Sequence, residues 1–419
     1  SVGEFVRKHC PSLFQPWEPT WWLNSGHLQT LWSSLGDFSD VDRVQYERAL
    51  LQLPDGGMIA VDFTEPPYDG DEKINHLTPI VIVLPGLTGG ACSSYVRSLL
   101  TVMCGPKSNG GLGYRGAVVN SRGCQRNVPL VTPRISAGSA DDLRSALLYI
   151  RSRYPNAPIF AVGFSLGAVV LMKYLGEEGK NSVLKGGCVV ACPWDLRKNS
   201  ELLESRFFYR QVYSRALAKS YLSVLHRSLP TLKIPPSSPF HAHLPLLQTL
   251  QRPTFTEVNT HLTRIIGGAP PVFPLPSVND FYTWASCVNE IHSVRVPLLC
   301  LNADDDPIVV ENELPYEEVR KANERGDGDG GWVAMVVTRG GGHLGWFTGE
   351  AKRRWISTPI VEWVRSLAEE VVWPESMAEV GRGTPAAGSR GDDPHPAYQV
   401  LSVGKAPEDT SIPGAMAGL

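Results

Sequence analysis

The chain has 419 residues, of which 42% are hydrophobic and 19% are charged, and its formal net charge is -3. This composition is typical of a folded soluble protein with a sizeable core, built as one large domain with insertions or as two domains. The balanced charge, without a lysine–arginine run, excludes the electrostatic footprint of a nucleic-acid-binding protein. No apolar run reaches the ~18–20 residues that a membrane-spanning helix needs.

Eight cysteines are scattered along the chain, several of them inside apolar segments. This distribution indicates buried free thiols in a reducing compartment rather than a disulfide framework. We therefore expect an intracellular protein, either cytoplasmic or peripherally associated with a membrane. The sequence opens without a secretory signal peptide. It also opens without Met, which leaves open an anchor that precedes residue 1.

Residues 1–44 form an aromatic-rich arm that carries Trp17, Trp21, Trp22 and Trp32 among prolines and polar residues. One interpretation is that these aromatic side chains pack on the domain. The alternative is a patch that rests at a lipid interface, where tryptophan is favoured, and so contacts a membrane or a lipid droplet. Residues 46–63 follow with two β-leaning stretches around Pro-Asp-Gly-Gly, which predicts a hairpin.

From residue 79 the pattern becomes an alternation of strands and helices. The Ile/Val run at 79–86 is typical of a strand buried on both faces. Further strands are expected at 114–123, 158–165 and 186–195, and helices at 93–104, 141–153 and 166–179. Repeated strand–helix units predict an α/β fold with a mostly parallel central sheet and helices on both faces.

This alternation stops at residue 196 and resumes near residue 293. The intervening segment has helix-like stretches and proline-rich joins, which predicts a helical cap or lid over residues 196–292. The core therefore falls into a first part, 45–195, and a second part, 293–373, with strands at 294–306 and 331–343 and a helix at 351–371. Residues 374–419 are rich in Gly, Pro, Ala and Ser, which predicts a flexible tail.

Ser165 lies at the centre of Gly-Phe-Ser-Leu-Gly, between a predicted strand and a predicted helix. The motif alone is weak, because glycine and serine are common in turns. Here Gly163 and Gly167 lack a Cβ where strand and helix must approach closely, and functional residues of a parallel sheet lie beyond the carboxyl ends of its strands. The context favours a nucleophile elbow over an inert turn.

A serine nucleophile needs a general base, and His343 is the candidate among ten histidines. It directly follows the last predicted strand, behind three glycines that free the backbone to aim the imidazole at Ser165. Four other histidines lie within the cap or at its end and are expected to be structural or to contact substrate: His241, His243, His261 and His292.

The acid that orients this base is expected after the preceding strand, where Asp304, Asp305 and Asp306 are adjacent. Three neighbouring carboxylates are costly to bury beside one imidazole, so one is expected in the site and the others solvated or capping. Asp306, followed by Pro307 and a hydrophobic run, is favoured. Asp305 is the leading alternative, and Asp195, at an earlier strand exit, is an outside one. The order Ser165–Asp306–His343 is that of an α/β-hydrolase.

Two backbone amides are expected to form an oxyanion hole. One belongs to Leu166, directly after the nucleophile, where the helix N-terminus adds its dipole. The other is expected in the loop Leu-Pro-Gly-Leu-Thr-Gly-Gly, at Leu87 with Thr88 nearby. The glycine-rich segments lack the phosphate-loop pattern, and no metal motif occurs, since Cys188 and Cys192 lie in a buried-looking strand. We expect neither a cofactor nor a metal ion.

Six motifs form a specific combination across residues 10–370: GHLQTLW (26–32), PGLTGG (85–90), NSRGC (120–124), GFSLGAVVLMKYLGEEG (163–179), LNADDDP (301–307) and GGHLGWF (341–347). Together they resemble one branch of the α/β-hydrolase-domain (ABHD) family. That branch includes bacterial YheT-like hydrolases, mammalian membrane-anchored ABHD lipases and yeast medium-chain fatty acid ethyl ester synthase/esterases. The resemblance is closest to the fungal members.

The resemblance implies an α/β-hydrolase fold and serine esterase or lipase activity on acylglycerols or on medium- or long-chain fatty acyl esters. Ser165, Asp306 and His343 fall on the family's triad positions. Pro85 stands where the family commonly has histidine, and Ala168 replaces a small glycine after the elbow. The cap matches poorly, so the acyl chain length and the alcohol moiety stay open.

The predicted function is therefore a serine carboxylesterase or lipase that acts through an acyl-enzyme on a small lipid ester. One alternative is an acyl-CoA:alcohol O-acyltransferase that makes fatty acid esters with the same triad. A second alternative is a non-catalytic scaffold of the hydrolase fold. No oligomeric state is predicted.

Overall fold

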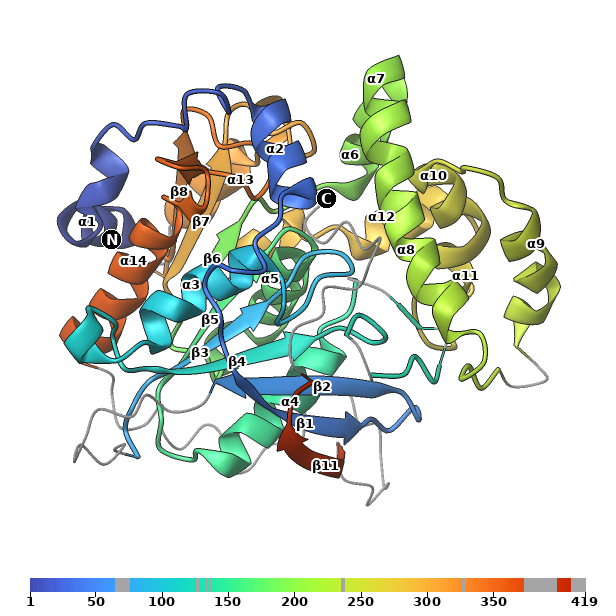
Figure 1. The fold of residues 1–419 in the computed structure, drawn as a ribbon, viewed down its shortest axis with the longest axis horizontal. Coiled ribbons are helices and arrows are strands. Elements are labelled where there is room, and N and C mark those ends of the chain that lie inside the picture. The colour runs from blue at the N-terminus through green and yellow to red at the C-terminus, as the bar shows by residue number, and fades with distance from the viewer. Residues whose placement is uncertain are drawn as a thin grey trace.

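The computed structural model describes residues 1–64, 76–125, 128–132, 134–135, 138–234, 238–325, 329–372 and 398–407. A nine-stranded sheet lies at its centre, in the order β11-β1-β2-β4-β3-β5-β6-β7-β8 (Figure 1). Its strands are β1 (Tyr46–Gln52), β2 (Met58–Thr64), β3 (Ile80–Leu84), β4 (Arg115–Asn120), β5 (Ile159–Phe164), β6 (Gly186–Val190), β7 (Leu298–Ala303), β8 (Val333–Thr338) and β11 (Gln399–Lys405).

Six neighbouring strands run parallel to one another, in the order β4-β3-β5-β6-β7-β8. Strands β2, β1 and β11 extend the sheet beyond β4 by antiparallel pairing. In β3, Ile80 and Ile82 face one hydrophobic core, and Val81 and Val83 face the other. A strand that alternates between two buried faces needs apolar residues at every position, which explains its continuous Ile/Val run. The predicted α/β class with a mostly parallel sheet is confirmed.

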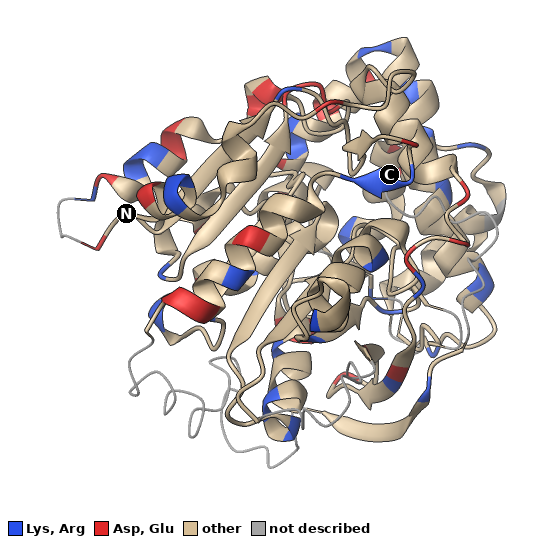
Figure 2. Ribbon diagram, turned by 60° about the vertical axis from the view of Figure 1, so that its left-hand side comes forward, with Lys and Arg blue, Asp and Glu red and all other residues tan. Residues whose placement is uncertain are grey.

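Helices cover both faces of this sheet. On one face, α4 (Asp141–Arg153) and α5 (Leu166–Glu178) bury leucines, alanines and valines in the larger core. On the other face, α3 (Ser94–Cys104), α14 (Ser357–Glu370) and α1 (Val2–His9) close the second core. Lysine, arginine, aspartate and glutamate are scattered over the helices and loops and are sparse on the strands (Figure 2).

A helical unit follows β6 and precedes β7, and it stands at the right of Figure 1 above the carboxyl ends of the strands. We call this unit, residues 196–285, the cap. Its α-helices are α6 (Leu196–Ser205), α7 (Phe207–Tyr209), α8 (Arg215–Ser228), α9 (Leu244–Thr249), α10 (Phe255–Val258), α11 (Arg264–Ile266) and α12 (Val278–Ala285). Two π-helical turns interrupt them, η4 (Arg210–Ser214) and η6 (Asn259–Thr263).

The structure differs from the sequence-based expectations at two places after β8. The last helix begins at Ser357 rather than near 351, because residues 347–354 form a small hairpin of β9 (Phe347–Thr348) and β10 (Arg353–Arg354). Within the segment expected to be a flexible tail, β11 pairs antiparallel with β1. All side chains of β11 are exposed, so the strand has no alternation of buried and exposed residues to mark it in the sequence. Residues 373–397 and 408–419 lie outside the described residues.

The N-terminal arm folds onto the core through part of its aromatic set. The ring of Trp17 stacks on Trp355 at 5.5 Å, and the indole N–H of Trp32 donates to the Ala351 carbonyl at 2.8 Å. Trp21, in contrast, is 84% exposed. In the described part of the chain, no helix is long and apolar enough to cross a membrane. All eight cysteines are free, and seven of them are buried.

Candidate active site

Ser165 occupies a strained turn between β5 and α5. Its φ of 51° and ψ of −116° fall where a residue with a side chain rarely lies. The Ser165 N–H donates to the Val190 carbonyl at 2.9 Å, which ties the turn to the neighbouring strand. A Cβ at Gly163 would lie 2.7 Å from the Ala168 Cα, and one at Gly167 only 2.1 Å from the Leu84 carbonyl oxygen. The two glycines are therefore required for strand and helix to meet at this angle.

Ser165, His343 and Asp306 form one buried hydrogen-bonded chain. The His343 Nε2 lies 2.8 Å from the Ser165 Oγ, and its Nδ1 lies 2.8 Å from an Asp306 carboxylate oxygen. The three residues are 7%, 0% and 2% exposed. The structure thus brings together residues that follow three different strands, β5, β8 and β7. In the sequence, His343 is 178 positions from Ser165 and 37 positions from Asp306.

The hydrogen bonds of the Asp306 carboxylate determine which ring nitrogen of His343 carries the proton. One carboxylate oxygen accepts the N–H groups of Ile308 at 2.7 Å and Val309 at 3.0 Å, so this carboxylate edge is occupied by donors. The remaining oxygen faces the His343 Nδ1, where a carboxylate can only accept a hydrogen bond. Nδ1 therefore carries the proton in the neutral imidazole, and Nε2 is left as the acceptor for the Ser165 hydroxyl.

The two other candidate acids lie elsewhere. A carboxylate oxygen of Asp305 accepts the Gly342 N–H at 2.8 Å, not the imidazole. Burial, followed by the charges of Asp304 and Asp306, raises the pKa of Asp305. Asp195 caps α6, where one oxygen accepts the N–H groups of the first helical turn. Only Asp306 of the three contacts His343.

The loop after β3 approaches Ser165 closely. A Cβ at Gly86 would lie 3.3 Å from the Ser165 Cβ. The Gly86 N–H donates to the Tyr95 hydroxyl at 2.9 Å, and the Ala91 N–H donates to the Asn120 side chain at 2.9 Å, so both ends of the loop are fixed. Thr88 has a φ of 57°, which turns the chain sharply after Leu87.

The amides of Leu87 and Leu166 are both available in this arrangement. Within the described residues, neither amide donates a hydrogen bond to another backbone group, and Leu166 is the first residue of α5. The first amides of a helix have no intrahelical acceptor and carry the positive end of its dipole. Leu87, Ser165 and Leu166 line one pocket, and backbone donors in such a position can stabilise an oxyanion.

An apolar pocket opens from Ser165 into the cap. From the core side it is lined by Leu87, Leu166 and Ile308. Its cap wall carries mainly large apolar side chains, with a few polar residues between them: Leu196, Asn199, Ser200, Leu203, Leu217, Tyr221, Phe255, Asn259, Phe281 and Tyr282. A pocket of this composition suits a hydrocarbon chain.

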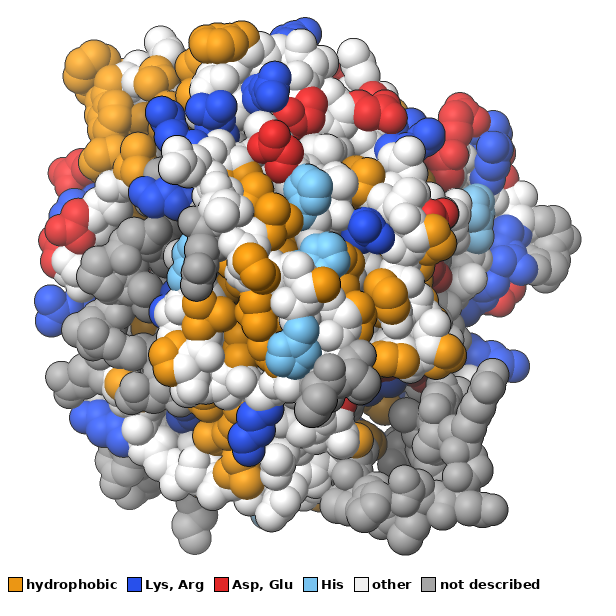
Figure 3. Space-filling view, turned by 90° about the vertical axis from the view of Figure 1, so that its right-hand side faces the viewer, with side chains coloured by type: hydrophobic (Ala, Val, Ile, Leu, Met, Phe, Trp, Pro, Cys, Tyr) orange, Lys and Arg blue, Asp and Glu red, His pale blue; other side chains and the backbone are white. Residues whose placement is uncertain are grey.

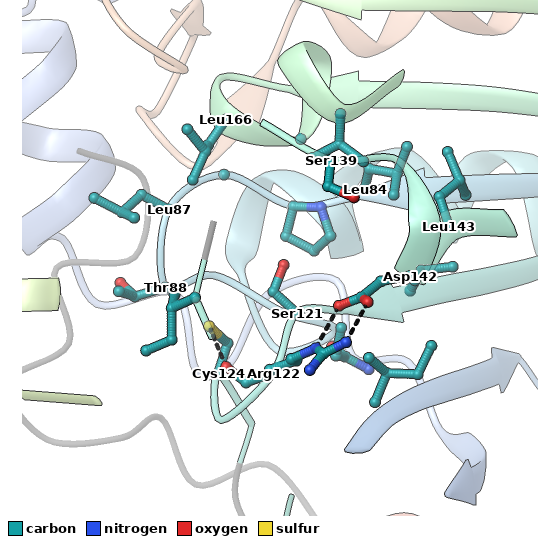
Figure 4. A pocket seen from close by; sticks show the side chains of 18 of the residues that line it. Leu84, Leu87, Thr88, Ser121, Arg122, Cys124, Ser139, Asp142, Leu143 and Leu166 are labelled. Carbon is teal, nitrogen blue, oxygen red and sulfur yellow. Dashed lines mark hydrogen bonds and ion pairs between the residues drawn. The ribbon is translucent and has the colours of Figure 1, made fainter. Parts of the chain in front are cut away.

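Leu87 and Leu166 also line a second cavity, which is shown in Figure 4. There the guanidinium of Arg122 pairs with both oxygens of Asp142, at 2.7 and 2.8 Å, and Thr132 and Asp55 bind it as well. Arg122 is 4% exposed and lines the same cavity as Leu87. The charges of this ion-pair network are satisfied within the protein.

The cap histidines do not reach the apolar pocket. Histidines lie on the outer face of the molecule among hydrophobic side chains in Figure 3, and His241 and His261 are exposed. Among the described residues, no cluster of three or more histidine, cysteine, aspartate or glutamate side chains is arranged to hold a metal ion.

Two residues that shape the site, Thr30 and Tyr95, were not selected from the sequence. Thr30 accepts the His343 N–H, and Tyr95 accepts the Gly86 N–H. Thr30 is far from His343 in the sequence, and Tyr95 lies inside a predicted helix. Thr30 lies within the motif GHLQTLW, and this motif was the feature of the sequence that pointed to its segment.

The fold identifies the class of protein as an α/β-hydrolase. Residues 79–231 match the family model described as alpha/beta hydrolase fold, and the chain contains a domain of that fold. Ser165 and both glycines of its turn lie within the matched residues.

Several relatives of this chain are named as lipases or esterases. Monoacylglycerol lipase of Saccharomyces cerevisiae is 28% identical over 385 residues, which cover 83% of this chain and 80% of the relative. Phospholipase ABHD3 of Bos taurus is 29% identical, with 83% and 77% covered. Medium-chain fatty acid ethyl ester synthase/esterase 2 of Saccharomyces cerevisiae is 27% identical, with 88% and 90% covered. The expected relationship to lipases and ester synthase/esterases is confirmed, and these relatives support a hydrolase function.

Proposed function

We propose that this protein is a serine ester hydrolase that cleaves medium- or long-chain fatty acyl esters or acylglycerols through an acyl-enzyme. The observation that carries the proposal is the 2.8 Å contact between the His343 Nε2 and the Ser165 Oγ, with Asp306 on the other side of the ring. The apolar pocket that begins at this serine supports an acyl chain as the bound group.

In this mechanism the Ser165 Oγ attacks the ester carbonyl carbon while its proton moves to the His343 Nε2. The carbonyl oxygen becomes an oxyanion, which the N–H groups of Leu87 and Leu166 bind. The Asp306 carboxylate stabilises the imidazolium. His343 then returns the proton to the leaving alcohol as the carbon–oxygen bond breaks. In the second half of the cycle a water molecule, deprotonated by His343, attacks the acyl carbon. The bond between this carbon and the Ser165 Oγ then breaks as His343 returns the proton to Oγ, and the fatty acid is released.

A fluorophosphonate probe tests the nucleophile directly. We expect it to label the wild-type protein and to leave Ser165→Ala unlabelled, since the probe reacts only with an activated serine. Ser121→Ala is a matched control, because Ser121 lies at the exit of β4 and lines only the second cavity. An unlabelled wild type, or equal labelling of Ser165→Ala, would favour the non-catalytic scaffold.

The acyl-enzyme can react in two ways, and analysis of the products separates them. Water yields a free fatty acid, whereas an alcohol in the same position yields a new ester. Products from p-nitrophenyl esters of increasing chain length, with and without added ethanol, distinguish hydrolysis from acyl transfer. We expect free acid to dominate without alcohol and the rate to rise with chain length until the pocket is filled.

We further propose that exposed aromatic side chains of the N-terminal arm and of α7 contact a lipid surface. Trp21 is 84% exposed and Phe207 is 81% exposed. The ring of His27, on α2 (Gly26–Leu35), lies 5.4 Å from that of Phe208, which joins the arm to α7. Trp and Phe side chains are favoured at such interfaces.

Flotation with phosphatidylcholine vesicles measures this contact. We expect Trp21→Ser combined with Phe207→Ser to reduce vesicle binding at least tenfold while hydrolysis of a soluble short-chain ester stays within twofold. Leu148→Ser combined with Val102→Ser removes exposed apolar side chains from α4 and α3 and serves as the control. Equal vesicle binding by both double variants would contradict the proposal.

A further inference from the structure

The loop that carries His343 has little stiffness of its own. Gly340, Gly341 and Gly342 have φ values of 73°, 137° and 57°, and these precede the histidine directly. Glycine loses more conformational freedom on ordering than any other residue. The position of the imidazole therefore depends on groups outside this loop.

Adjacent carboxylates hold the loop at successive points. Asp304 accepts the Gly340 N–H at 2.7 Å, and Asp305 accepts the Gly342 N–H at 2.8 Å. Asp306, the next residue, holds the ring of His343 itself. Hydrogen bonds to a carboxylate are stronger than those between neutral groups, and that of Asp305 is partly shielded from solvent.

Thr30 supplies the remaining contact from the N-terminal arm. Its hydroxyl oxygen accepts the His343 N–H at 2.8 Å and donates its own proton to the Gly26 carbonyl at 2.6 Å. Thr30 is 0% exposed. A Cβ at Gly342 would lie 2.4 Å from the Gly26 carbonyl oxygen, so helix α2 is pressed against the loop.

We propose that Asp305 and Thr30 are positioning residues for the general base, and that helix α2 of the N-terminal arm is thereby part of the catalytic apparatus. Neither side chain touches the reacting atoms. Each fixes a backbone N–H next to the imidazole, Asp305 at Gly342 and Thr30 at His343, and so keeps Nε2 within hydrogen-bonding distance of Ser165. The inference rests on the proposed function.

Kinetics of Asp305→Ala and Thr30→Val test the inference, because each substitution removes one acceptor. Displacement of a catalytic group by about 1 Å costs on the order of 100-fold in rate. We expect kcat for a p-nitrophenyl ester to fall ten- to 100-fold with KM within twofold. The rate of fluorophosphonate labelling falls in parallel. Asp305→Asn keeps an acceptor oxygen and is expected to recover most of kcat.

Thr20→Val is the matched control. Thr20 belongs to the same arm, is 2% exposed, and donates from its hydroxyl to the Gly349 carbonyl, away from His343. We expect it to change the unfolding midpoint as Thr30→Val does but to leave kcat within twofold. An equal loss of kcat in both threonine variants would assign Thr30 a merely structural role and overturn the inference.

A spectroscopic signal separates this inference from the proposed function. The proton on the His343 Nδ1, bonded to a buried carboxylate, gives a far-downfield proton resonance that does not depend on turnover. We expect the signal in the wild type and in Thr20→Val, and its loss or broadening in Thr30→Val and Asp305→Ala. An unchanged signal in both of these variants would refute the positioning role, even if the wild type proved unreactive toward the probe. Should Asp305→Ala fail to fold, Thr30→Val and Asp305→Asn still decide the question.

Discussion

Replacement of Asp306 by asparagine changes one atom of the site and reverses the polarity of its central hydrogen bond. The Ile308 and Val309 N–H groups require an acceptor, so the asparagine oxygen faces them. The asparagine NH₂ then points at the His343 Nδ1, which must become an acceptor and leave its proton on Nε2. In that tautomer Nε2 cannot take the proton of Ser165.

The expected loss follows from this tautomer change. A wrong tautomer in a serine–histidine–carboxylate site costs about 10⁴-fold in kcat, which corresponds to about 5 kcal/mol of activation free energy. The shape of the side chain is preserved, so we expect the unfolding midpoint to stay close to that of the wild type. Steady-state hydrolysis of a p-nitrophenyl ester gives kcat, and circular dichroism during denaturation gives the midpoint.

Asp195→Asn is the matched control for this substitution. Asp195 caps α6 through one oxygen, and asparagine is an equally good N-cap residue. We expect kcat within twofold of the wild type. A loss of less than tenfold in Asp306→Asn, or a similar loss in both variants, would refute the assignment of Asp306 as the residue that orients the base.

Arg122→Leu leaves two half-buried carboxylates without their shared partner, and we expect a loss of about 3 kcal/mol in the free energy of unfolding. Urea denaturation measures this loss, and an unchanged midpoint would show that the ion pairs contribute nothing net. Gly167→Ala forces a Cβ to within 2.1 Å of the Leu84 carbonyl oxygen, so we expect about 3 kcal/mol of destabilisation and loss of probe labelling. Normal labelling of a stable Gly167→Ala protein would contradict the tight turn. Burial raises the pKa of Asp305, so the folded state disfavours the charged carboxylate. The free energy of unfolding is therefore expected to fall as the pH rises through the folded pKa and Asp305 becomes charged. Asp305→Asn is therefore expected to be more stable than the wild type at pH 7, with the gain vanishing as pH falls below about 4; a gain that persists in acid would refute this cause.

The sequence carried most of the information about the core sheet. Apolar runs such as that of β3 are buried on both faces, and such runs are visible without any knowledge of their neighbours. Strand β11 was not predictable, because its side chains are exposed and its partner in the described sheet, β1, is more than 300 positions away. Pairing between backbone groups leaves no mark on side-chain composition.

The sequence by itself determined the candidate residues Ser165 and His343, because a small-residue turn after a strand and a histidine after a glycine run are local patterns. It narrowed the acid to a short aspartate run but left Asp306 and Asp305 as alternatives. Only the tertiary structure assigned one carboxylate to the imidazole and the other to the Gly342 amide. Adjacent residues of a turn point in different directions, and which of them meets a distant side chain depends on the packing of elements that lie far apart in the chain.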